Sequence, residues 1–259
     1  MADKNSGPGV IHKAATLDAH EITEAELAAI NKHTLEPLKA KDVFTFKAVL
    51  CDNEVDRSYE RFSLKALKGL QKLFVGKTII KDHTWAADNQ VARIYSTELV
   101  QSNKTTQAGE TYTQLVAHCY MVKTASNADL IAEIKAGIKK EGSVGCAVSS
   151  SICSICGTDN VKSYCAHWPG RSYNKAGAME VCTFVLDGAA DAYEFSLVAV
   201  PAQKAAGVHK SKSYTGETVY EPQEGAEAPA DETTSHDSEK ATTLALRARL
   251  AANRAKINN

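Results

Sequence analysis

The stretch AYEFSLVAV, residues 192–200, combines β-forming aromatic and branched residues with one carboxylate, and it stops just before Pro201. Such a composition favours a strand, and proline ends it because its nitrogen cannot donate to a sheet. A carboxylate within a buried strand is costly unless it is paired. Two interpretations of Glu194 therefore stay open: it meets a partner, or alternation places it on the solvent side with Ser196.

Working outward, six further segments have strand composition, at 43–50, 77–81, 91–100, 111–120, 144–152 and 180–186. Ser63 is placed to cap a helix that carries leucines at 64, 67, 70 and 73. Residues 125–140 have helical periodicity, with an expected buried stripe of Leu130, Ile131, Ile134 and Ile138. Because helices and strands do not alternate, we expect an α+β fold: a mostly antiparallel β-barrel of about seven strands flanked by helices.

Composition divides the chain into four regions. Residues 1–40 are predicted to be an N-terminal extension with a short helix, opened by a capping box of Thr23 and Glu26. Residues 41–210 form the main domain. Residues 211–240 are acidic and rich in small polar residues, which predicts a flexible linker. Residues 241–259 are basic and are either a frayed helical tail or a docking peptide.

Overall composition narrows the classes of function. The 259-residue chain has a net charge of −1, 44% hydrophobic residues and a mean hydropathy of −0.28, as expected for a soluble protein with a core. No run approaches the roughly 18 apolar residues that span a bilayer. Met1–Gly9 lacks the apolar segment of a secretion signal. We therefore expect a cytoplasmic location, no membrane partner and no general affinity for nucleic acid.

Three of the seven cysteines crowd into one short segment, as Cys153-x2-Cys156-x8-Cys165-x-His167. Without a secretion signal this spacing favours metal ligation over disulfides. Three thiolates and an imidazole make the tetrahedral Cys3His set of a structural zinc site, which has no open position for catalysis. We predict a zinc-binding insert at 153–175. Cys182 is a fifth candidate if His167 is not a ligand, and the alternative is a loop of unligated thiols.

Three residues could perform nucleophilic chemistry. His83 follows Asp82 at the end of the apolar strand 77–81, where a base can be mounted rigidly. Ser143 lies in Gly-Ser-Val-Gly (142–145), which predicts a tight helix-to-strand turn near an oxyanion site. Glu194 could orient a histidine. Each has an ordinary structural explanation when taken alone, and Cys146 is an alternative nucleophile.

The order His83, Ser143, Glu194, each beside an apolar strand, resembles the prohead maturation proteases of tailed bacteriophages, which share a clan with the herpesvirus assemblins. The resemblance covers roughly residues 43–206 and is most specific in the segment 193–202. Members with a Cys/His insert before the last motif look especially similar. The family fold, a mainly antiparallel β-barrel flanked by helices, agrees with the expected strands.

Carried onto this chain, the resemblance implies a serine endopeptidase with Ser143 as nucleophile, His83 as general base and Glu194 orienting His83. Asp187 and Asp191 are nearby acids that could replace Glu194. The implied substrates are major capsid and scaffold proteins, with self-cleavage, inside the assembling prohead in the host cytoplasm. No cofactor is needed for this catalysis.

Two other functions stay open. The first is a catalytically inactive capsid-assembly or scaffold-binding protein of the same fold. The second is nucleic-acid binding by the Cys/His insert, whose cations Lys162, Arg171 and Lys175 give only a thin positive surface for phosphates.

Overall fold

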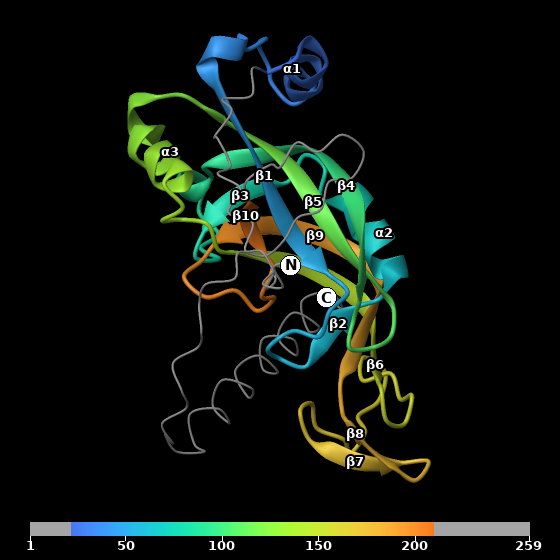
Figure 1. The fold of residues 1–259 in the computed structure, drawn as a ribbon. Coiled ribbons are helices and arrows are strands. Elements are labelled where there is room, and N and C mark those ends of the chain that lie inside the picture. The colour runs from blue at the N-terminus through green and yellow to red at the C-terminus, as the bar shows by residue number, and fades with distance from the viewer. Residues whose placement is uncertain (1–21, 210–259) are drawn as a thin grey trace, which may run out of the picture. The chain divides into compact units, whose positions relative to one another are not determined.

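The computed structural model describes residues 22–209, all within one compact unit (Figure 1). It is an α+β fold, mostly strands with few helices. The helices are α1 (Glu24–Asn31), α2 (Leu64–Leu73) and α3 (Ala128–Lys135), with short 3-10 segments at Ala40–Asp42, Ala87–Asn89 and Ala125–Asn127. The strands are β1 (Val43–Asp52), β2 (Glu60–Phe62), β3 (Thr78–Lys81), β4 (Ala92–Thr105), β5 (Thr111–Val122), β6 (Gly142–Cys153), β7 (Ser172–Lys175), β8 (Ala178–Val181), β9 (Phe184–Leu197) and β10 (Gly207–His209).

Eight of these strands form one sheet in the order β10-β1-β5-β4-β3-β9-β2, with β6 also paired to β9. Strand β9 pairs with three strands. It is parallel to β2 and β3 along one edge and antiparallel to β6 along the other. The other ladders are antiparallel. The expected barrel is wrong, because the sheet stays open. Glu141, the residue before β6, forms one bridge with Gly207 of β10, and no ladder extends it within residues 22–209.

Strand β9 also corrects an expectation. The sequence predicted two strands, at 180–186 and 192–200, whereas one strand runs through Asp187 and Gly188. Two irregularities interrupt its register with β6, and Gly188 adopts a positive φ of 66°. The polar break in the sequence is thus a bulged, bent strand rather than a loop, which is a usual role for glycine within a strand.

Helix α2 follows from its sequence as expected. The Ser63 hydroxyl accepts a hydrogen bond from the Ala66 N–H at 2.9 Å and so caps the helix. Leu67 and Leu70 are fully buried against the sheet. Helix α3 is shorter than predicted, because Gly137 ends it with a φ of 73°, and Ile138 beyond it is exposed rather than buried.

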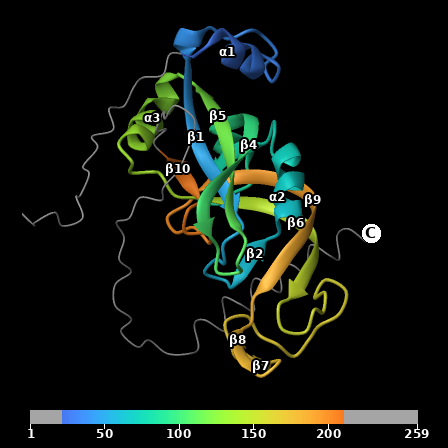
Figure 2. The same ribbon diagram turned by 45° about the vertical axis from the view of Figure 1, so that its right-hand side comes forward.

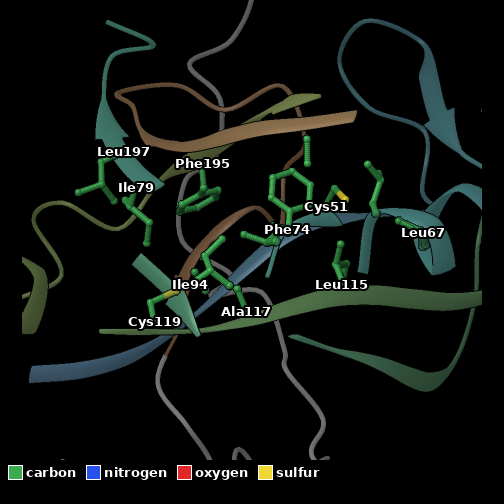
Figure 3. Packing of buried hydrophobic residues seen from close by; sticks show 14 of the residues in the cluster. Cys51, Leu67, Phe74, Ile79, Ile94, Leu115, Ala117, Cys119, Phe195 and Leu197 are labelled. Carbon is green, nitrogen blue, oxygen red and sulfur yellow. The ribbon is translucent and has the colours of Figure 1, made fainter. Parts of the chain in front are cut away.

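The main core lies where α2 packs over the sheet (Figure 3). Phe195 and Leu197 of β9 face Ile79 of β3, Ile94 of β4 and Phe74 after α2 in one continuous cluster. Burying each large side chain contributes about 1.5–3 kcal/mol. The core side of β9 is therefore firmly held, which fixes the position of the residues on its other side.

The capping box of α1 is present: the Thr23 hydroxyl accepts from the Glu26 N–H, and the Glu26 carboxylate accepts from the Thr23 N–H. Ile30 of this helix is fully buried in a cluster with Tyr95 and Tyr120, so the described part of the N-terminal region packs on the sheet. The predicted linker at 211–240 and basic segment at 241–259 lie outside the described residues.

The Cys/His segment leaves the sheet at the end of β6 and returns at the start of β9, and β7 and β8 form its small hairpin (Figures 1 and 2). Within residues 22–209, no helix has the length and apolar character needed to cross a membrane.

Candidate functional site

The Gly-Ser-Val-Gly segment is part of strand β6 and not the turn that the sequence predicted. Its glycines are required by neighbours on β9. A Cβ on Gly142 would overlap the ring of Phe195, and a Cβ on Gly145 would lie 2.5 Å from Glu194 Oε1. Both glycines therefore provide room for side chains of the adjacent strand, one on each face of the sheet.

Ladder register places three polar residues on one face. Ser143 pairs with Ser196, and Gly145 pairs with Glu194. Directly paired residues of an antiparallel ladder point to the same side. Glu194 and Ser196 thus share the face opposite Phe195, as alternation predicts, but this face is not solvent-exposed at that point. Glu194 is only 3% exposed and Ser196 is fully buried.

His83 contacts this buried carboxylate from the solvent side. Its Nδ1 lies 2.7 Å from Glu194 Oε1, and its side chain remains 39% exposed. Ser196 supports both partners, because its hydroxyl donates to Glu194 Oε2 at 2.8 Å and accepts from the His83 backbone N–H at 3.0 Å. Ser196 is a member of the site that sequence reasoning missed, although its place two residues after Glu194 on one strand was an available signal.

The backbone that delivers His83 is unusual. Asp82 and His83 follow β3 with φ values of 53° and 51°, in the left-handed region that non-glycine residues rarely adopt. The Asp82 N–H donates to the Leu197 carbonyl at 3.0 Å, which extends the pairing of β3 with β9 into this turn. Strained turns of this kind persist where surrounding contacts determine them, and they cluster at functional sites.

Ser143 lies next to this pair. Cβ atoms of directly paired residues are about 4.5–5.5 Å apart, which places the Ser143 hydroxyl beside Ser196 on the His83 side of the sheet. Among the residues that the structure describes, no hydrogen bond joins Ser143 to His83.

The other two acids are engaged elsewhere. Asp187 accepts a 2.7 Å hydrogen bond from the Ser63 hydroxyl. Asp191 lies 3.6 Å from the Lys77 ammonium. Glu194 is therefore the acid that meets His83. The alternative nucleophile, Cys146, is disfavoured because burial, with Glu194 nearby, raises its pKa to about 12, so it is almost entirely protonated at neutral pH.

A second histidine–glutamate pair provides a contrast. His118 Nε2 lies 2.9 Å from Glu98 Oε1 on the paired strands β4 and β5. Glu98 is 42% exposed and also contacts Lys47 at 3.6 Å, and the His118 hydrogen bond lowers the Glu98 pKa. The shared Glu98 carboxylate is open to solvent, so water competes for it. The His83–Glu194 pair differs in having a buried carboxylate.

The predicted metal ligands converge. One donor atom from each of Cys153, Cys156, Cys165 and His167 lies within 4.8 Å of the others. Thiolate sulfurs on a tetrahedral zinc are about 3.8 Å apart, given Zn–S bonds of about 2.3 Å, so these donors need only small shifts to hold one ion. The arrangement is a Cys3His cluster that could bind a metal, as the sequence predicted.

Two features of the cluster fit a cation. His167 Nδ1 is buried and has no hydrogen-bond partner within the described region. Hydrogen bonds with the Thr158 hydroxyl and backbone lower the pKa of Cys156 to about 6, which favours the thiolate that metals require. Cys182, the fifth candidate, is fully buried with its Sγ 3.7 Å from Cys153 Sγ, beside the cluster and outside the four-donor group.

The site therefore consists of a buried glutamate–histidine pair with a serine on the adjacent strand, and a separate Cys3His cluster at the other end of β6. Comparisons with known proteins found no matching family model, no matching curated protein and no matching solved structure.

Proposed function

We propose that this protein is a serine endopeptidase in which Ser143 is the nucleophile, His83 the general base and Glu194 the residue that orients His83. The observation that carries the proposal is the 2.7 Å hydrogen bond between His83 Nδ1 and a carboxylate that is 3% exposed. A buried carboxylate facing an accessible imidazole is the arrangement that fixes a catalytic histidine.

The pair sets the direction of proton transfer. In this scheme the His83 Nδ1–H donates a hydrogen bond to Glu194 and keeps its proton, so Nε2 is the acceptor nitrogen of the neutral ring. Nε2 takes the proton of the Ser143 hydroxyl as its oxygen attacks the scissile carbonyl carbon. The imidazolium then returns that proton to the leaving amine. Water, deprotonated by the same nitrogen, releases the acyl group from Ser143.

Glu194 has its own support in this scheme. The Ser196 hydroxyl donates to Oε2, so Oε1 stays directed at His83. This matters because a displacement of the catalytic base by about 1 Å can reduce the rate of the reaction about a hundredfold. Gly145 contributes by leaving space for the carboxylate, which accounts for a glycine in the middle of a paired strand.

A metal held by Cys153, Cys156, Cys165 and His167 would be structural zinc. Four protein ligands leave no position for water or substrate. Zinc bound there would supply no acid–base chemistry, and its role would be to hold the insert together at the end of β6.

The resemblance to prohead maturation proteases supplies the proposed setting. The substrates would be the major capsid and scaffold proteins, together with the chain itself, cleaved inside the assembling phage prohead. The competing proposal is an inactive assembly protein of the same fold, which is favoured by the missing hydrogen bond between Ser143 and His83 in the described structure.

Coexpression with the major capsid protein separates these two proposals. Ser143→Ala should abolish capsid-protein cleavage and labelling by a fluorophosphonate, which modifies activated serines. Ser149→Ala is the matched control, because Ser149 is an exposed serine farther along the same strand. Cleavage that continues in Ser143→Ala would eliminate the protease assignment to this residue. Absence of both cleavage and labelling in the unmodified chain would favour the inactive assembly protein.

A further inference from the structure

The segment from Asp82 to Asn89, which carries His83, is held at both ends. The Asn89 side-chain amide donates to the Lys81 carbonyl at 2.7 Å and to the Thr84 carbonyl at 2.9 Å. The His83 N–H is bound to Ser196 at 3.0 Å. A loop bonded to itself and to the sheet presents its side chains in fixed positions.

Trp85 projects from this loop. The residue is 69% exposed, although it is the largest apolar residue in the segment. Its ring centroid lies 5.5 Å from that of Tyr193, with an interplanar angle of 51°. Tyr193 directly precedes Glu194 and is the extra residue where the register of β9 shifts against β6. The two contacting aromatic rings therefore come from the two segments that supply His83 and Glu194, and each is within two residues of its member of the pair.

We propose that Trp85 and Tyr193 form an aromatic platform that binds a large apolar side chain of a peptide substrate, next to the bond that is cut. This rests on the proposed function of the site. Trp85 is two residues from His83, and an extended peptide advances about 3.3 Å per residue. The platform thus lies within one or two substrate residues of the position where His83 acts.

The chemistry of the pair defines the occupant. An exposed indole gains from covering its face with aliphatic or aromatic carbon, and tryptophan presents about 150–250 Å² for this purpose. Lys81, just before this segment, and Asp82 and Asp88 within it are the nearby charges in the sequence; their signs are mixed, so they do not select a charged side chain. An apolar residue such as leucine or phenylalanine in an extended peptide is the substrate class that fits.

Tryptophan fluorescence can test binding without catalysis. The chain has two tryptophans, so Trp168→Phe with Ser143→Ala leaves Trp85 as the reporter in a full-length chain that cannot cleave. Two blocked hexapeptides, identical except for a central leucine or serine, are titrated into it. We expect a saturable change in emission with the leucine peptide, at a concentration about tenfold or more below any change with the serine peptide. Equal responses, or no response to the leucine peptide, would overturn the proposal.

Cleavage gives a second readout, which distinguishes a failure of the platform proposal from a failure of the proposed protease function. In the chain with Ser143 intact, cleavage sites in a peptide mixture are identified by mass spectrometry. The preference for a large apolar residue within two positions of the cut should fall about tenfold in Trp85→Ala and persist in Trp85→Phe. Trp168→Ala, which alters an exposed tryptophan on the insert, should keep it. An unchanged preference in Trp85→Ala refutes the platform, whereas no cleavage by any variant refutes the protease function and leaves the fluorescence result to decide peptide binding.

Discussion

Replacing Gly145 by alanine tests whether space beside β9 positions the buried carboxylate. The added Cβ would lie 2.5 Å from Glu194 Oε1 and 3.2 Å from its carboxyl carbon. Carbon atoms prefer separations of about 3.5–4.0 Å, so Glu194 must move by about 1 Å. Because Glu194 is bonded to His83 and Ser196 and is 3% exposed, it has no free direction in which to relax.

The expected cost follows from two known effects. Overpacking of this kind destabilises by about 1–3 kcal/mol, and weakened bonds to a charged group add to it. We expect Gly145→Ala to lower the free energy of unfolding by about 2–3 kcal/mol, which lowers the melting temperature by about 4–12 °C in a domain of this size. Fluorophosphonate labelling of Ser143 should fall by about a hundredfold because His83 loses its alignment.

Gly69→Ala is the matched control. Its Cβ would lie 2.7 Å from the Ala189 Cβ, a comparable overlap that does not involve Glu194, and alanine gains about 1 kcal/mol over glycine in a helix. We expect a smaller loss of stability and normal labelling. Adding Glu194→Asp to Gly145→Ala shortens the carboxylate arm and should recover part of the stability. If Gly145→Ala unfolds and labels like the unmodified chain, the steric argument for this glycine is wrong.

Two further predictions concern other parts of the described chain. Burial raises the pKa of Asp52 from 3.8 to about 6; because the folded state holds this proton more tightly, about 3 kcal/mol of stability is lost as the pH rises from about 4 to 6. Asp52→Asn should remove that loss. The urea unfolding midpoint of the variant, relative to that of the unmodified chain, should therefore rise between pH 4 and pH 7. A difference between the two midpoints that does not change with pH would contradict this. The full chain should bind about one zinc ion. Cys153→Ser should weaken zinc binding by more than about a hundredfold, whereas Cys51→Ser should leave it unchanged. Equal zinc content in the two variants, measured by mass spectrometry, would show that the cluster is not a metal site.

Local features were predictable because their causes are local. Ser63 and Leu67 of α2 specify a capped helix with one apolar face, and no distant residue is needed to explain them. The Cys/His cluster was predictable for a related reason: metal ligation imposes a short sequence spacing, and Cys153 and Cys156 have it. The hydrogen bond of Glu194 to His83 was expected from the resemblance, and the residues alone left Glu194 open between a buried and an exposed position.

The features that sequence reasoning missed depend on distant pairing. Gly142 and Gly145 were interpreted as turn residues because glycine is common in turns, whereas their neighbours on β9 explain them. Ladder register decides this, and register is not visible in either strand alone. The expected barrel failed for the same reason. Closure requires β6 and β10 to pair along their length, and within residues 22–209 this edge has one bridge, between Glu141 and Gly207.

The connection between β6 and β9 has a consequence for how the chain could have acquired its insert. Cys153 and Phe184 are direct partners in the ladder, so residues 154–183 begin and end at neighbouring points of the sheet. Replacing a two-residue hairpin by these thirty residues costs about 2–3 kcal/mol of loop-closure entropy. Metal binding can supply more than this. We therefore expect that a version of this sheet joined by a short turn between Cys153 and Phe184 would still fold and keep Ser143 beside Ser196.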